Sequence, residues 1–123
     1  MKPEITYGEF AKLDLRVATI LEAAPVEGSL RLLTLKLGIG RQCDPDRVEG
    51  EETFECQRQI VAGIGEEYAV ESLVGKQIVV ILNLEPKVIR GVESNGMLLA
   101  ADVDGKPILL SIARPVPDGA VVR

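Results

Sequence analysis

The chain has 123 residues, of which 46% are hydrophobic, 27% charged and only 3% aromatic. These proportions are typical of one folded domain, and they exclude a disordered, collagen-like or low-complexity chain. The formal net charge of −5, taken over the whole chain, argues against a nucleic-acid partner, and the absence of histidine removes the commonest general base of enzymes.

The negative charge is concentrated in one segment. Residues 42–57 hold six acidic residues and a single arginine, which accounts for the whole net charge, while 13 basic and 13 acidic residues balance in the rest of the chain. Because the segment is polar and contains Pro45 and Gly50, we predict an exposed acidic loop over residues 41–57. The remainder is neutral, so the net charge does not exclude RNA.

The first half of the chain predicts one short helix and several strands. Thr6 and Glu9 have the spacing of a capping box, which predicts a helix over residues 7–12. Leucines alternate with Thr34 and Lys36, as in a half-buried strand. The predicted strands of this half cover residues 14–23, 30–40 and 58–64.

The second half predicts one or two helical turns over residues 66–73 and three further strands. These strands cover residues 76–84, 97–102 and 106–112. Pro86 ends the first of them because proline has no amide hydrogen to donate. Asp104-Gly105 is a strong signal for a hairpin turn between the last two. We predict that residues 87–96 are irregular and that residues 115–123 form an extended tail.

About six short strands with one helical segment between the third and fourth predict an all-β fold, either a small barrel or a sandwich. This order is that of the five-stranded oligonucleotide/oligosaccharide-binding (OB) barrel, here with a C-terminal extension. Since no linker is apparent, residues 1–123 are predicted to form a single domain. The predicted core comprises Val17, Ile20, Leu33, Leu35, Ile60, Val79, Ile81, Leu98 and Leu99.

The candidate functional residues cluster in residues 83–102. The side chains suited to RNA contact are Asn83, Lys87, Arg90, Ser94 and Met97. Cations suit phosphates, amide and hydroxyl groups suit base edges, and a thioether packs against a base face. The alternative is an ordinary strand connection with solvated charges, because Glu85 and Glu93 balance the two cations.

The same region carries a family resemblance. The chain resembles the tRNA-binding domain at the C-terminus of bacterial methionyl-tRNA synthetases, its free-standing relatives and the endothelial monocyte-activating polypeptide II group. The specific element runs from Asn83 through RGVES-x-GM to Ala100 and Ala101. The matching stretches are residues 14–23, 30–40, 58–64, 73–102 and 116–123.

The resemblance implies a non-catalytic module that binds structured tRNA with little sequence specificity, alone or as an accessory to methionyl-tRNA synthetase. It also implies a homodimer to which residues 107–123 contribute, and it adds Arg31, where relatives often have lysine, to the RNA-contacting residues. The chain departs from the family pattern at Glu85 and Val88, where relatives usually carry basic residues. A protein-export chaperone of the CsaA type, which shares the barrel, and a scaffold that docks a synthetase remain alternatives.

Cys43 and Cys56 bracket the acidic loop, and three interpretations of them stay open. They are two reduced thiols, a disulfide that closes the loop, or part of a metal site shared across a dimer. No resident metal or cofactor is predicted within one chain, because two cysteines without histidine do not supply a four-ligand zinc site.

The sequence also predicts a cytoplasmic protein. No apolar run approaches the ~20 residues of a membrane-spanning helix, and residues 1–10 lack the apolar stretch of a signal peptide.

Overall fold

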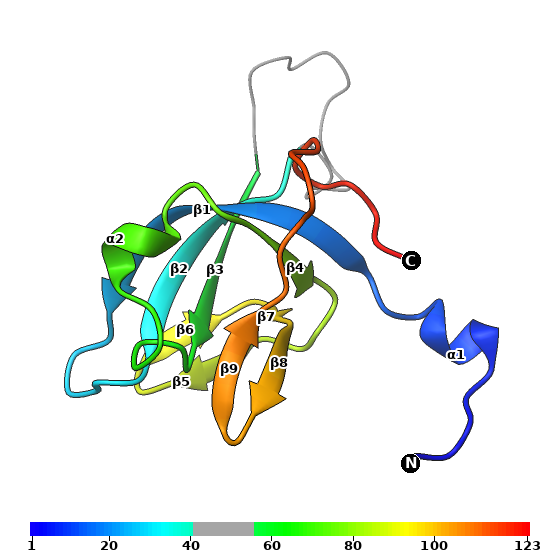
Figure 1. Ribbon diagram of the computed structural model, residues 1–123, viewed down its shortest axis with the longest axis horizontal. Coiled ribbons are helices and arrows are strands. Elements are labelled where there is room, and N and C mark those ends of the chain that lie inside the picture. Colours follow the sequence, from blue (N-terminus) through cyan, green and yellow to red (C-terminus); the bar gives the residue numbers. More distant parts are fainter. Residues whose placement is uncertain (41–55) are drawn as a thin grey trace.

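Five strands form one antiparallel sheet in the computed structural model, which describes residues 1–40 and 56–123 (Figure 1). In spatial order they are β3 (Gln57–Ala62), β2 (Leu33–Gly38), β1 (Leu15–Pro25), β4 (Gln77–Ile81) and β7 (Met97–Leu98). The outer strands β3 and β7 contact each other, and the Asn95 amide donates to the Gln59 carbonyl (2.8 Å) just before β7. The sheet is therefore a nearly closed five-stranded barrel, which confirms the predicted fold.

The long central strand β1 joins the two halves of the sheet. Its first part pairs with β4 and its second part with β2, and the register shifts by one residue between Ile20 and Glu22. Such a bulge bends a strand and increases its twist, which is how one strand serves two sides of a small barrel.

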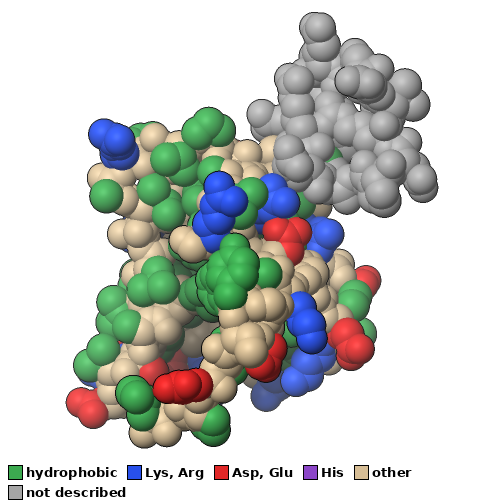
Figure 2. All heavy atoms as spheres, turned by 90° about the vertical axis from the view of Figure 1, so that its right-hand side faces the viewer, with side chains coloured by type: hydrophobic (Ala, Val, Ile, Leu, Met, Phe, Trp, Pro, Cys, Tyr) green, Lys and Arg blue, Asp and Glu red, His purple; other side chains and the backbone are tan. Residues whose placement is uncertain are grey.

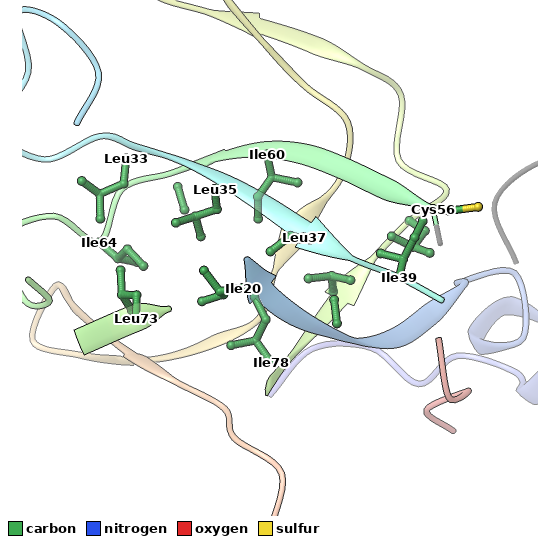
Figure 3. Close-up of a cluster of buried hydrophobic side chains, with 14 residues drawn as sticks. Ile20, Leu33, Leu35, Leu37, Ile39, Cys56, Ile60, Ile64, Leu73 and Ile78 are labelled. Atoms are coloured by element: carbon green, nitrogen blue, oxygen red, sulfur yellow. The ribbon is translucent and has the colours of Figure 1, made fainter. Parts of the chain in front are cut away.

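The hydrophobic core fills the inside of this barrel. Alternate side chains of β1, β2, β3 and β4 point inward, and Figure 3 shows Ile20, Leu35, Ile60 and Ile78 facing one another. Of the predicted core, the residues confirmed as buried are Val17, Ile20, Leu33, Leu35, Ile60, Val79 and Ile81. The prediction was wrong for Leu98 and Leu99, which are only partly buried because they lie on or beside the two-residue edge strand β7.

The described residues also form two short helices. The capping box of Thr6 and Glu9 is confirmed, but α1 (Tyr7–Phe10) is shorter than predicted and buries none of its residues. The second helix, α2 (Val70–Leu73), lies between β3 and β4 in the chain, as predicted. It packs against β1, and its fully buried Leu73 joins the core.

Residues 87–96 are not irregular, so that prediction was wrong. They form a hairpin of β5 (Lys87–Ile89) and β6 (Val92–Ser94). Its two turn residues, Arg90 and Gly91, both have positive φ (50° and 80°), as type I′ hairpins require. Arginine is not a usual residue for this backbone region, so the sequence lacked the common turn signal.

The predicted strand over residues 97–102 is divided into two. Its first part is β7, which pairs with β4, whereas β8 (Ala100–Val103) pairs with β9 (Lys106–Leu109) in a separate hairpin. The predicted Asp104-Gly105 turn joins β8 to β9 and is confirmed.

The C-terminal tail returns to the barrel and lies along β1. Val17 donates its amide to Ala120 (2.9 Å), Gly119 donates to Val17 (2.8 Å), and an isolated bridge joins Arg16 to Val121. Both chain ends therefore lie on the same side of the molecule (Figure 1). Within residues 1–40 and 56–123, no helix is long and apolar enough to cross a membrane.

Residues 41–55 lie outside the described residues, so most of the predicted acidic loop stays a prediction. Cys43 belongs to this part of the chain. Cys56 is buried at one end of the core (Figure 3), and the interpretations that involve Cys43 fall outside the described residues.

Candidate nucleic-acid interface

The β5–β6 hairpin, the β4–β5 connection, Val61 of β3 and the start of β7 line a groove of about 470 Å³. It contains three of the predicted RNA-contacting residues, Lys87, Ser94 and Met97. The apolar part of its lining comes from Val61, Leu84, Pro86 and Ile89. We call this the hairpin groove.

Lys87 and Met97 are the accessible members of the hairpin groove. Lys87 is exposed at the start of β5, and among the described residues no ion pair or hydrogen bond engages its amine. Met97 is 48% exposed on β7. Glu85 also lines the groove, and its negative charge balances that of Lys87. A ligand that suits this groove is therefore an uncharged planar group next to a single anion, rather than a run of phosphates.

Ser94 contributes to the barrel rather than to the open surface. It is 5% exposed, accepts a hydrogen bond from the Val61 amide (2.9 Å) and donates to the Gly96 carbonyl (3.3 Å). Its hydroxyl thereby joins β6 to β3, and both of its bonds lie within the chain.

Asn83 connects the N-terminal segment to the residues that follow β4. Its Oδ1 accepts from the Asp14 amide (2.8 Å), and its Nδ2 donates to the Lys12 carbonyl (2.6 Å). Although the side chain is exposed, both of its polar atoms already have partners, so its RNA contact stays a prediction.

Arg90 and Arg31 lie at two other places near the hairpin groove. Arg90 is exposed at the tip of the β5–β6 hairpin, with its Nη1 3.5 Å from the Gly28 carbonyl of the β1–β2 connection. Arg31 lies in that same connection and lines a separate pocket with the β8–β9 hairpin. The structure therefore distributes the predicted residues over a groove, a hairpin tip and a second pocket.

Two β3 residues that the sequence did not single out hold this surface in place. Arg58 donates to the Leu82 carbonyl (2.9 Å), and Gln59 donates to the Glu93 carbonyl (3.0 Å). They anchor both sides of the hairpin groove to the barrel. No local pattern marks them, because their partners lie on strands that are distant in the sequence.

The face that carries α1 and the chain ends has a mixed surface of charged and hydrophobic side chains (Figure 2). Figure 2 shows acidic and basic side chains interspersed there, with hydrophobic side chains between them. On the described part of this face, the charges form no continuous basic patch.

A family model described as a putative tRNA-binding domain matches residues 15–121. The chain belongs to this family. The match includes the barrel, the hairpin groove and the tail that lies along β1, and it confirms the resemblance seen in the sequence.

Curated relatives of this tRNA-binding domain include methionine–tRNA ligases. The ligase of Methanothrix thermoacetophila is 48% identical over 99% of the chain, and that of Bacillus subtilis is 40% identical over 98%. The chain spans only 16% of the length of each of these ligases.

Solved structures show that the whole described fold recurs in free-standing proteins. A methionyl-tRNA-synthetase-related protein from Pyrococcus horikoshii superposes with a TM-score of 0.81 at 32% identity, covering 99% of this chain and 100% of that one. The chaperone CsaA of Bacillus anthracis has the same fold, with a TM-score of 0.80 at 24% identity, covering 98% and 100% of the two chains.

Proposed function

We propose that this domain is a non-catalytic module that binds tRNA through the hairpin groove and the tip of the β5–β6 hairpin. The observation that carries the proposal is the family match over the residues that build this surface, where Lys87, Arg90 and Met97 are exposed. The amine and guanidinium would contact phosphates, and Met97 would pack against a base.

We also propose that the module assists a methionine–tRNA ligase, either as part of a longer chain or in trans. Its relatives in this class are about six times as long, which supports an accessory rather than a catalytic role. A tRNA partner would be met in the cytoplasm. With few aromatic side chains to stack on bases, the module would read tRNA largely through shape and backbone.

Fluorescence anisotropy with labelled bulk tRNA across a salt series tests the proposal. We expect log K to fall linearly with log salt, because bound cations displace counterions from phosphates. The double variant Lys87→Ala/Arg90→Ala should bind more weakly and with a shallower slope, by roughly 0.7–0.9 for each phosphate that is no longer neutralised.

A matched control is the double variant Lys2→Ala/Arg123→Ala, which removes the same charges from exposed positions near the chain ends. It should retain most of the wild-type affinity. Equal reductions of affinity in the two double variants, or no tRNA binding by a folded wild type at low salt, would contradict the proposal.

Peptide binding in the manner of a CsaA-type chaperone is the second candidate, and the apolar lining of the hairpin groove favours it. Competition between labelled tRNA and an unfolded apolar peptide separates the two functions. The chaperone function would be favoured if the peptide displaced tRNA and if Met97→Ala weakened peptide binding but not tRNA binding. A scaffold that docks a synthetase would instead bind the ligase without tRNA.

We further propose that the chain forms a homodimer to which residues 107–123 contribute. Apolar side chains of this segment are exposed in the single chain, including Ile108 (42%), Leu110 (43%) and Val121 (56%). Sedimentation velocity should show a dimer that Leu110→Asp dissociates. Leu30→Asp, at a 90% exposed leucine outside this segment, is the control and should leave the dimer intact.

A further inference from the structure

A second pocket, of about 340 Å³, lies between the β1–β2 connection, the residue that follows β3, and the β8–β9 hairpin. Its main lining residues are Arg31, Gly63, Ala100, Ala101, Asp102 and Pro107. This volume is at the lower end of the ~300–1,000 Å³ typical of small-ligand sites. We call it the Arg31 pocket.

The backbone of Arg31 is held in place from two sides. The Ser29 hydroxyl oxygen accepts hydrogen bonds from the amides of Arg31 (3.2 Å) and Leu32 (3.0 Å), while the Arg31 carbonyl accepts from the Gly65 amide (2.7 Å). A side chain at position 65 would lie only 2.9 Å from that carbonyl, so glycine is what allows this approach.

The side chain of Arg31 packs directly on a second glycine. A Cβ atom at position 63 would lie 2.9 Å from Arg31 Nε and 3.3 Å from its Nη2, so the guanidinium lies against the bare backbone of Gly63. No described carboxylate forms an ion pair with it. Arg31 is thus an exposed, oriented guanidinium whose donors are available to a ligand.

Asp102 places a negative charge in the part of the pocket formed by the β8–β9 hairpin. Its Oδ1 accepts from the Gly105 amide (2.8 Å) in the β8–β9 turn, which orients the carboxylate. One cation and one anion make the pocket neutral, and the carboxylate repels a phosphate. A neutral, flat group with hydrogen-bond donors matches it, and the small side chains of Ala100 and Ala101 leave room for such a ring.

We propose that the Arg31 pocket binds a single unpaired base of the RNA and prefers guanine. This inference rests on the proposed tRNA-binding function and deepens it. The Asp102 carboxylate accepts from the guanine N1–H and N2–H groups, which are two adjacent donors that adenine does not present. The Arg31 guanidinium stacks on the base, as its planar shape permits.

The test uses two fluorescently labelled uridine oligomers that differ only in one central nucleotide, guanosine or adenosine. We expect the wild type to bind the guanosine oligomer about tenfold more tightly. Asp102→Asn should abolish this preference, because the amide keeps an acceptor for the Gly105 amide but replaces one carboxylate oxygen with a donor. Asp104→Asn, at the neighbouring turn residue, is the matched control and should retain the preference.

Gly63→Ala tests the position of the guanidinium without changing any charge. The added methyl group must displace Arg31, whose flexible side chain yields at little cost to stability. We expect the affinity for both oligomers to fall about as far as in Arg31→Lys, because stacking acts on either base, with an unchanged melting temperature and an unchanged salt slope of bulk tRNA binding.

These experiments test the Arg31 pocket separately from the proposed tRNA-binding function. Equal affinity of the wild type for the two oligomers, a guanosine preference that survives Asp102→Asn, or an oligomer affinity that survives Gly63→Ala would overturn the assignment. Binding of bulk tRNA without binding of either oligomer would also overturn it and leave the tRNA function standing. Failure to bind tRNA as well would remove both.

Discussion

Ser94 has the chemistry of an RNA-contacting residue but serves the barrel. Its hydroxyl satisfies the Val61 amide in a buried position where water cannot replace it. Asn83 resembles it, because its amide group connects two segments that are distant in the sequence. At the scale of single residues, side-chain type indicates which contacts are available, and burial determines which partner receives them.

We predict that Ser94→Ala destabilises the fold by about 1–3 kcal/mol, the cost of leaving a buried amide donor unsatisfied. Urea denaturation followed by circular dichroism measures the free energy of unfolding. The exposed neighbour in Glu93→Ala is the control and should change that free energy by less than about 0.5 kcal/mol. A Ser94→Ala protein with wild-type stability and reduced tRNA affinity would instead assign the hydroxyl to RNA.

At the scale of elements, the two hairpins offer a direct comparison. Asp104-Gly105 and Arg90-Gly91 occupy equivalent turn positions, and the first residue of each has a positive φ, 52° and 50°. Aspartate tolerates this region, whereas for arginine it costs ~1–3 kcal/mol. The strained residue is the one at the tip of the proposed tRNA surface.

We therefore predict that Arg90→Asn raises the free energy of unfolding by about 0.5–1 kcal/mol, because asparagine-glycine is the preferred pair for such turns. The same change should weaken tRNA binding, since it removes a cation. Thermal unfolding and tRNA anisotropy measure the two effects independently.

The matched control is Asp104→Asn, which changes the equivalent position of the β8–β9 hairpin and should leave both quantities close to wild type. A gain in stability with unchanged tRNA affinity would show that Arg90 is not part of the RNA surface. An unchanged stability would contradict the strain argument.

At the scale of the whole molecule, the C-terminal tail is fastened to the barrel by one small network. Asp118 Oδ1 accepts from the Thr19 hydroxyl (2.5 Å) and from Gln77 Nε2 (3.3 Å). Gln77 also donates to the Val116 carbonyl (2.7 Å) and accepts from the Val116 amide (3.1 Å). Side chains of β1 and β4 thus hold a segment that has little regular structure of its own.

We predict that Asp118→Ala releases the tail and lowers the free energy of unfolding by about 1–3 kcal/mol, because two polar groups are deprived of their acceptor. Hydrogen exchange of the Val17 amide, which donates to Ala120 in the tail, should accelerate. The exposed Glu67→Ala variant is the control for charge removal. Unchanged Val17 protection in Asp118→Ala would mean that the tail is held by its other contacts alone.

The net negative charge of the molecule comes from one segment and not from the barrel. Residues 42–57 account for the whole net charge, and the barrel that carries the proposed tRNA surface is neutral. Glu85 beside Lys87 keeps the hairpin groove neutral too. We therefore expect tRNA affinity to depend on a few exposed cations and on base contacts rather than on a broad basic field.

Much of the fold could be predicted from patterns between neighbours in the chain. Alternating leucines predicted β2, the spacing of Thr6 and Glu9 predicted the cap of α1, and Asp104-Gly105 predicted the β8–β9 turn. Each of these signals concerns residues a few positions apart, whose geometry the backbone itself determines. The hairpin at Arg90 escaped prediction because its turn uses an uncommon residue.

The tertiary structure alone decided which candidate residues reach solvent and which of them meet. It buried the Ser94 hydroxyl, exposed Lys87 and Met97 in one groove, and brought Arg31 together with Asp102 from a distant hairpin. The physical reason is that burial and hydrogen-bond partners depend on contacts between distant strands, which barrel closure creates and local sequence patterns do not encode.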